Sequence, residues 1–225
     1  MIICFDLDDT LYDEISYVES GFKEISKYLN GLNILNFSEN EIYLNLMNIL
    51  ERKGRGRIFD EFLKKNNIKS KNLVKKCLSI YRKHKPNIKL NENVEEILCL
   101  FKKKYGNLYL VTDGNLIAQR NKIKALNLNK YFYKTLPTHQ YGTKHSKPST
   151  YVFEKICKWE KIEMHNLVYI GDNPYKDFVN LKKLGAITIR LNQGMFKNVN
   201  LSEKFMADFQ VDNIKQISKF IIENE

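Results

Sequence analysis

The sequence predicts a doubly wound, Rossmann-like α/β fold with a parallel sheet core and an inserted all-helical cap domain. The first observation is a set of short, mostly apolar runs with the length of buried strands, at residues 2–5, 108–112, 167–170 and 187–191, of which 2–5 is unbroken. The second is that helical patterns, with apolar residues three and four apart, separate the later runs. The third is that residues 14–86 show helical patterns alone. Strands that alternate with helices indicate a parallel sheet covered on both faces.

The helical block comes directly after the first apolar run. Its predicted helices lie at residues 15–29, 39–51, 59–63 and 70–83. Ser38 and Glu41 form a capping-box pattern at the start of the second of these helices. We therefore expect a helical cap inserted into an α/β core, with the cap made of residues 14–86 and the core of residues 1–13 and 87–225. An insertion at this point is expected to cover the carboxyl end of the first strand.

After the helical block the chain alternates between helical and strand patterns. Helices are predicted near residues 94–101, 116–126, 149–158, 175–183 and 214–222. Two shorter runs predict further strands, at 133–136 and 209–211. All strands of the predicted core except the first therefore follow the cap in the sequence.

The composition is that of an ordinary globular chain. Of the 225 residues, 43% are hydrophobic and 28% are charged, and no apolar stretch is long enough to span a bilayer. The four cysteines have no metal-ligand spacing, so we expect buried, reduced thiols in a cytoplasmic protein.

The net charge of +11 favours an anionic partner. The lysines are spread along nearly every segment, which favours a diffuse, solvated surface over a nucleic-acid-binding stripe. A small phosphorylated metabolite is the expected partner, no membrane partner is expected, and no pattern predicts an oligomeric state.

Chemically active residue types follow several of the predicted strands. In order, they are Asp6, Asp8 and Thr10; Thr112, Asp113 and Gly114; Lys147; and the stretch from Asp172 to Asp177. In parallel α/β sheets, ligands bind at the carboxyl ends of the strands. A single acid at a strand end usually serves as a turn or cap residue. Several such groups, each at a strand end or in a loop that follows, point instead to a shared active site.

The set is complete for phosphoryl transfer through an aspartyl phosphate. A carboxylate can attack phosphorus as a covalent nucleophile, and Mg²⁺ with oxygen ligands can offset the charge of two anions. A lysine and a hydroxyl can hold the non-bridging phosphate oxygens. A second carboxyl can protonate the leaving alcohol and later take a proton from water.

The run Asp6-Leu7-Asp8-Asp9-Thr10 resembles the first motif of the haloacid dehalogenase superfamily of hydrolases. The other three motifs resemble the segments at Thr112, at Lys147 and from Gly171-Asp172 to Asp177. With the helical cap, the resemblance covers essentially the whole chain.

The resemblance implies a role for each matching position. Asp6 would be the nucleophile and a metal ligand, and Asp8 the general acid/base with its backbone carbonyl on Mg²⁺. Thr112 and Lys147 would bind the transferring phosphoryl group. The remaining positions would support the site. Asp172 would complete the metal site, and Asp177 would support the metal site or orient Lys147. Thr10 would order the loop, and the backbone of Asp113 and Gly114 would bind the phosphate. Similar enzymes often carry Asn where this chain has Asp113.

We therefore expect a Mg²⁺-dependent phosphatase that hydrolyses a sugar phosphate or a nucleoside monophosphate. Asp8 disfavours dehalogenation, which has no leaving alcohol to protonate. A phosphomutase remains an alternative, and a non-catalytic phosphate-binding regulatory protein is a weaker one. In the cap, the basic stretch containing Arg55 and Arg57 is a candidate for substrate recognition, with a solvated turn between helices as the alternative.

Overall fold

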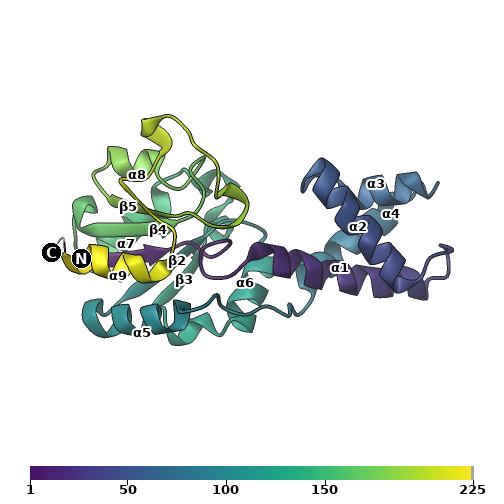
Figure 1. Cartoon of the computed structure of the whole chain (residues 1–225), viewed down its shortest axis with the longest axis horizontal. Coiled ribbons are helices and arrows are strands. Elements are labelled where there is room, and N and C mark those ends of the chain that lie inside the picture. Colours follow the sequence, from purple (N-terminus) through teal and green to yellow (C-terminus); the bar gives the residue numbers. More distant parts are fainter. Residues whose placement is uncertain (224–225) are drawn as a thin grey trace. The chain divides into compact units, whose positions relative to one another are not determined.

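The structure, a computed structural model, describes residues 1–223 and divides into two compact units (Figure 1). One unit joins Met1–Glu14 to Lys89–Glu225, and the other is Ile15–Ile88. The first unit holds the sheet, and the second is entirely helical.

Six parallel strands form the sheet of the α/β unit, in the order β3-β2-β1-β4-β5-β6. They are β1 (Ile2–Phe5), β2 (Leu108–Thr112), β3 (Lys134–Pro137), β4 (Leu167–Gly171), β5 (Ile187–Leu191) and β6 (Phe209–Val211). Strand β1 lies at the centre, with Ile3 opposite Leu108 on one side and Val168 on the other. The order reverses direction at β1, which is the doubly wound arrangement that the sequence predicts.

Helices cover both faces of this sheet, which explains why its strands are apolar without alternation. Cys4, Tyr109 and Tyr169 belong to one core cluster, which also contains Phe153. The neighbouring residue Phe5 points to the opposite face, where its ring lies 6.2 Å from that of Phe101. The helices of this unit are α5 (Val94–Tyr105), α6 (Leu116–Ala125), α7 (Tyr151–Glu160), α8 (Val179–Lys183) and α9 (Ile214–Glu223).

The helical unit has a hydrophobic core of its own. Its helices are α1 (Glu14–Gly31), which begins at the last residue of the other unit's first segment, α2 (Glu39–Lys53), α3 (Ile58–Lys65) and α4 (Lys71–Lys83). Phe22, Leu46, Phe62 and Cys77 are among its buried residues. At the start of α2 the predicted capping box is present: the Ser38 hydroxyl accepts from the Glu41 backbone N–H, and the Glu41 carboxylate accepts from the Ser38 backbone N–H.

Two local predictions are wrong. The helix predicted at 175–183 is confined to α8, and a turn precedes it, because the Asp177 carboxylate accepts a hydrogen bond from the Asn173 backbone N–H at 2.9 Å. This contact folds the loop back on itself. The four cysteines are free thiols, but Cys99 is exposed on α5 rather than buried.

Short 3₁₀ segments complete the fold, at Leu128–Lys130, Thr138–Tyr141, Thr143–His145, Met164–Asn166, Gly194–Phe196 and Glu203–Phe205. Within residues 1–223, none of the helices has the length and apolar character required to cross a membrane.

Candidate active site

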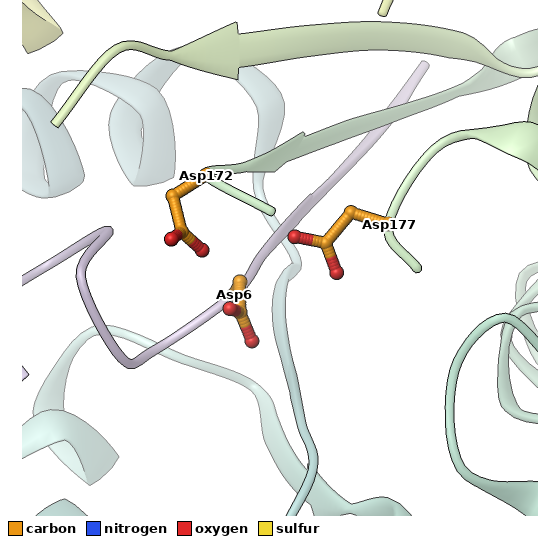
Figure 2. Close-up of side chains that lie close together, drawn as sticks. All are labelled: Asp6, Asp172 and Asp177. Carbon is orange, nitrogen blue, oxygen red and sulfur yellow. The ribbon is translucent and has the colours of Figure 1, made fainter. Parts of the chain in front are cut away.

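Two neighbouring strands end in the carboxylates at the centre of the site. Asp6 follows β1, and its backbone N–H continues the ladder by donating to the Ile170 carbonyl at 2.8 Å. Asp172 follows β4, which pairs with β1. With Asp177, each of these residues offers one carboxylate oxygen within 4.8 Å of the other two, and all three residues are buried. Figure 2 shows the three side chains lying close together.

A single buried lysine lies against this cluster. The Lys147 ammonium is 2.7 Å from Asp6 Oδ1 and 2.8 Å from Asp177 Oδ1, and it donates to the Tyr169 hydroxyl at 2.8 Å. Lys147 is thus held in part by Tyr169, a residue of β4 that sequence reasoning did not identify. Gly171, at the end of the same strand, leaves room for the Asp177 side chain, because a Cβ on Gly171 would lie 2.6 Å from Asp177 Oδ2.

The cluster carries more negative charge than Lys147 can neutralise. Burial, with a contribution from Asp177, raises the pKa of Asp6 to about 7 against the opposing effect of Lys147. Burial, followed by Asp177 and Asp6, raises the pKa of Asp172 to about 9. Buried acids of this kind must hold a proton or bind a cation. Hard divalent cations prefer carboxylate oxygens, so Asp6 and Asp172 fit Mg²⁺ well.

A second aspartate–lysine pair lies two residues further along the chain. Asp8 is 2.7 Å from the buried Lys122 ammonium and accepts hydrogen bonds from the Tyr12 hydroxyl at 2.5 Å and from Gln119 Nε2 at 2.9 Å. Burial opposes ionisation of Asp8, but Lys122 and the two neutral donors overcome it, so the pKa of Asp8 is lowered. Lys122 also lies 3.5 Å from Glu14 Oε1.

Sequence reasoning did not identify Gln119 and Lys122, although a signal was present. Both belong to α6 and are buried, together with Ala118 and Ile123. Residues three apart on a helix lie on the same face, so the two polar side chains reach Asp8 together. Two polar residues on the buried face of a helix therefore mark an internal partner, and here that partner is 114 residues away from Lys122 in the sequence.

The predicted phosphate-binding residues lie at the end of β2. The Thr112 hydroxyl is buried and has no hydrogen-bond partner within the described part of the chain, as expected of a group whose acceptor is a ligand oxygen. Gly114 has a φ of +131°, and a Cβ there would lie 2.6 Å from Gln119 Nε2. The Thr10 hydroxyl is likewise buried without a partner among residues 1–223, while the Thr10 carbonyl accepts from Gln193 Nε2.

The Asp113 side chain connects three segments around Lys147. Its Oδ1 accepts from the Thr138 hydroxyl at 2.6 Å and from the Lys147 backbone N–H at 3.1 Å. Its Oδ2 lies 3.4 Å from the Lys176 ammonium. Burial opposes ionisation of Asp113, but Lys147 and Lys176 lower its pKa.

The two arginines proposed for substrate recognition belong to the helical unit. Arg55 and Arg57 lie in the turn between α2 and α3, and both are exposed. Arg57 has a φ of +54°.

The fold and this site define a class of enzyme. Residues 3–190 match the family described as haloacid dehalogenase-like hydrolase, and the chain belongs to that family. The match confirms the predicted superfamily and its hydrolase class.

A curated relative with a named activity is similar over nearly the whole chain. The chain is 28% identical over 222 residues to the glyceraldehyde 3-phosphate phosphatase of Methanocaldococcus jannaschii, covering 96% of this chain and 94% of that protein. The relative's name agrees with the predicted phosphatase.

Solved structures confirm the fold. A 2-haloacid dehalogenase from Pseudomonas syringae pv. tomato has a TM-score of 0.68 at 19% identity, and the comparison covers 100% of both chains. A Bacillus subtilis protein solved bound to magnesium has a TM-score of 0.73 at 14% identity, covering 98% of this chain and 97% of that one.

Proposed function

We propose that the protein is a Mg²⁺-dependent phosphatase that hydrolyses a small sugar phosphate through a phosphoryl group carried on Asp6. The observation that carries the proposal is the buried cluster in which Asp6 lies beside Asp172 and is paired with Lys147 at 2.7 Å. The carboxylate proposed as nucleophile, the acid proposed to bind the cation with it and the lysine proposed to bind phosphate therefore lie together. Bound Mg²⁺ would offset the charge of the phosphoryl group, with Asp6, Asp172 and the Asp8 carbonyl as its protein ligands.

In the first half of the reaction, a carboxylate oxygen of Asp6 attacks phosphorus. A bond forms between that oxygen and phosphorus as the bond from phosphorus to the substrate oxygen breaks. The Thr112 hydroxyl and the backbone N–H groups of Asp113 and Gly114 would hold the phosphoryl oxygens. The lowered pKa of Asp8 favours its carboxylate, so the protonated form of Asp8 would be the reactive minority in this step, and it would give its proton to the leaving oxygen.

In the second half, water attacks the phosphorus on Asp6. Asp8 takes a proton from this water, the bond between phosphorus and the Asp6 oxygen breaks, and inorganic phosphate leaves. Tyr12, Gln119 and Lys122 hold the Asp8 carboxylate in one orientation, which suits it to a role on a single reacting oxygen.

The substrate proposed first is glyceraldehyde 3-phosphate, on the basis of the relative's name. Other sugar phosphates come next, followed by nucleoside monophosphates. We further propose that residues 14–86 serve as a cap and that Arg55 and Arg57 contribute to substrate recognition there. Replacing either arginine with Ala would then raise KM for the true substrate and leave kcat nearly unchanged.

Phosphate release from a panel of phosphate monoesters tests the function, with Mg²⁺ or with EDTA present. We expect turnover that depends on the metal and is lost in Asp6→Asn but kept in Asp60→Asn, whose carboxylate is exposed on α3. Isomerisation of a sugar phosphate without phosphate release would instead indicate a mutase. Phosphate binding without turnover of any substrate would indicate a regulatory protein.

A further inference from the structure

A second lysine lies beside the phosphate-binding residues, in the loop that follows β4. The Lys176 ammonium is 3.4 Å from Asp113 Oδ2, and its side chain is 30% exposed. Lys176 lies within the segment that resembles the fourth motif, but the resemblance gives it no role. Sequence reasoning placed it in a helix, whereas the structure places it in the turn that Asp177 organises.

Lys147 is held mostly by the protein itself. Its ammonium donates to Asp6 Oδ1 at 2.7 Å and to the Tyr169 hydroxyl at 2.8 Å, and Asp177 Oδ1 lies 2.8 Å away as an ion-pair partner. An ammonium group has three N–H donors, so at most one remains for the phosphoryl group. The non-bridging oxygens that Lys147 does not contact can accept hydrogen bonds from a second cation.

Lys176 has donors to spare. Among residues 1–223, its ammonium contacts the Asp113 carboxylate alone, at a distance longer than a usual charged hydrogen bond. Burial and the nearby Lys147 disfavour its charge, yet Asp6, Asp177 and Asp113 raise its pKa, so Lys176 is charged. The ammonium is therefore anchored beside the site, on a side chain that is partly exposed.

The acid at position 113 suits this arrangement. Asp113 Oδ1 accepts from Thr138 and from the Lys147 backbone N–H. The oxygen of an asparagine could accept both bonds equally well. The second oxygen, Oδ2, faces Lys176, where an asparagine would present an NH₂ group that cannot accept a bond from an ammonium. The carboxylate at this position thus provides Lys176 with an acceptor that an asparagine would lack.

We propose that Lys176, anchored by Asp113, is a second phosphate-binding cation that donates directly to the non-bridging oxygens of the substrate's phosphoryl group. The proposal rests on the proposed function for its substrate, but not for the binding of phosphate itself. The pair adds to Lys147 a second charged donor with free N–H groups. A phosphate monoester dianion is the ligand that gains most from it.

Calorimetric titration of the Mg²⁺-loaded protein with inorganic phosphate tests the proposal without turnover. Lys176→Met should weaken phosphate binding about tenfold or more, the usual size for a lost charged hydrogen bond. Asp113→Asn should weaken it less, and should add little when combined with Lys176→Met, because both changes act on one contact. Lys176→Arg should recover a large part of the affinity.

Two controls separate the alternatives. Lys183→Met removes an exposed lysine from α8 and should leave binding unchanged, so that an equal loss there would indicate a net-charge effect and overturn the proposal. Unchanged binding in a folded Lys176→Met variant would also overturn it. If Lys176→Arg binds as weakly as Lys176→Met, the role is structural and the proposal fails. A wild-type protein that binds phosphate through Lys176 but hydrolyses no monoester would refute the proposed function alone.

Discussion

The two buried aspartate–lysine pairs at the start of the chain are similar in geometry and opposite in electrostatics. Asp6 pairs with Lys147 and Asp8 with Lys122, each at 2.7 Å. Yet the pKa of Asp6 is raised to about 7 by burial and by Asp177, whereas Lys122 and two neutral donors lower that of Asp8. The difference lies in the other neighbours of each aspartate: Asp6 lies close to the acids Asp177 and Asp172, whereas Asp8 accepts hydrogen bonds from Tyr12 and Gln119.

This comparison teaches how one strand end can hold two carboxylates with separate functions. Asp6 shares its lysine with Asp177 and lies beside Asp172, so its surroundings have a deficit of positive charge that a metal ion can fill. Asp8 has Lys122, Tyr12 and Gln119 around it, so its charge is already compensated. The metal is therefore expected on the Asp6 side.

Removing Lys147 should have the largest effect. In Lys147→Met the buried acids lose their paired cation, so we expect a loss of about 3–5 kcal/mol in the free energy of unfolding without metal. Turnover should fall about a thousandfold or more. Denaturant unfolding and phosphate-release assays measure the two effects. Near-normal turnover in this variant would show that the site does not depend on the lysine.

Removing Lys122 should affect catalysis through Asp8. Lys122→Met frees the Asp8 carboxylate from its strongest partner, so we expect kcat to fall about a hundredfold with little change in KM. The matched control is Lys124→Met, which removes an exposed lysine from the same helix. A rise in KM with an unchanged kcat would contradict a role through Asp8.

Neutralising Asp172, which lies beside the first pair, and Asp8, which belongs to the second, should shift stability in opposite directions. Between about pH 4 and pH 9, folded metal-free protein holds a proton on Asp172 that the unfolded chain releases, so its stability falls as pH rises. Asp172→Asn should therefore stabilise metal-free protein by about 1–3 kcal/mol near pH 8. Asp8→Asn should destabilise the metal-free protein. Because the pKa of Asp8 is lowered in the folded state, its ionised carboxylate stabilises the fold above the usual pKa of an aspartate, and this stabilisation is lost as the pH falls.

Thermal unfolding in EDTA at acid and mildly alkaline pH measures both variants. Added Mg²⁺ should raise the Tm of the wild type and have much less effect on Asp172→Asn. Shifts in the same direction for the two variants would remove the distinction between the pairs.

The smallest effect is expected from Tyr12→Phe. It removes one neutral donor from Asp8 while Gln119 and Lys122 remain, so kcat should fall about three- to tenfold. An effect as large as that of Lys122→Met would show that the hydroxyl, and not the ammonium, controls Asp8. Steady-state kinetics of the two single variants and the double variant decide between them.

The sequence predicted the parts of the structure that depend on local patterns. Short, mostly apolar runs indicated strands buried on both faces, and the doubly wound sheet is confirmed. The acids at the ends of β1 and β4 could be placed together because parallel strands end at one edge.

The missed residues have partners that no local pattern identifies, even where, as at Gln119 and Lys122, polar residues on a buried helix face indicate that a partner exists. Lys122 meets Asp8 across 114 residues, and Lys176 meets Asp113 across 63. Lys176 was also hidden by the helical pattern of 175–183, which the hydrogen bond between Asp177 and Asn173 overrides. In each case the partner could be recognised only after the sheet had placed its strand ends.

Chemical trapping of the reaction tests the central claim most directly. Protein mixed with Mg²⁺ and a hydrolysed sugar phosphate, then quenched with acid, should carry a phosphoryl group on Asp6 when its peptides are examined by mass spectrometry. The group should be absent with EDTA and in Asp6→Asn. A phosphoryl group on another residue, or full turnover in Asp6→Asn, would contradict the assignment of Asp6 as the nucleophile.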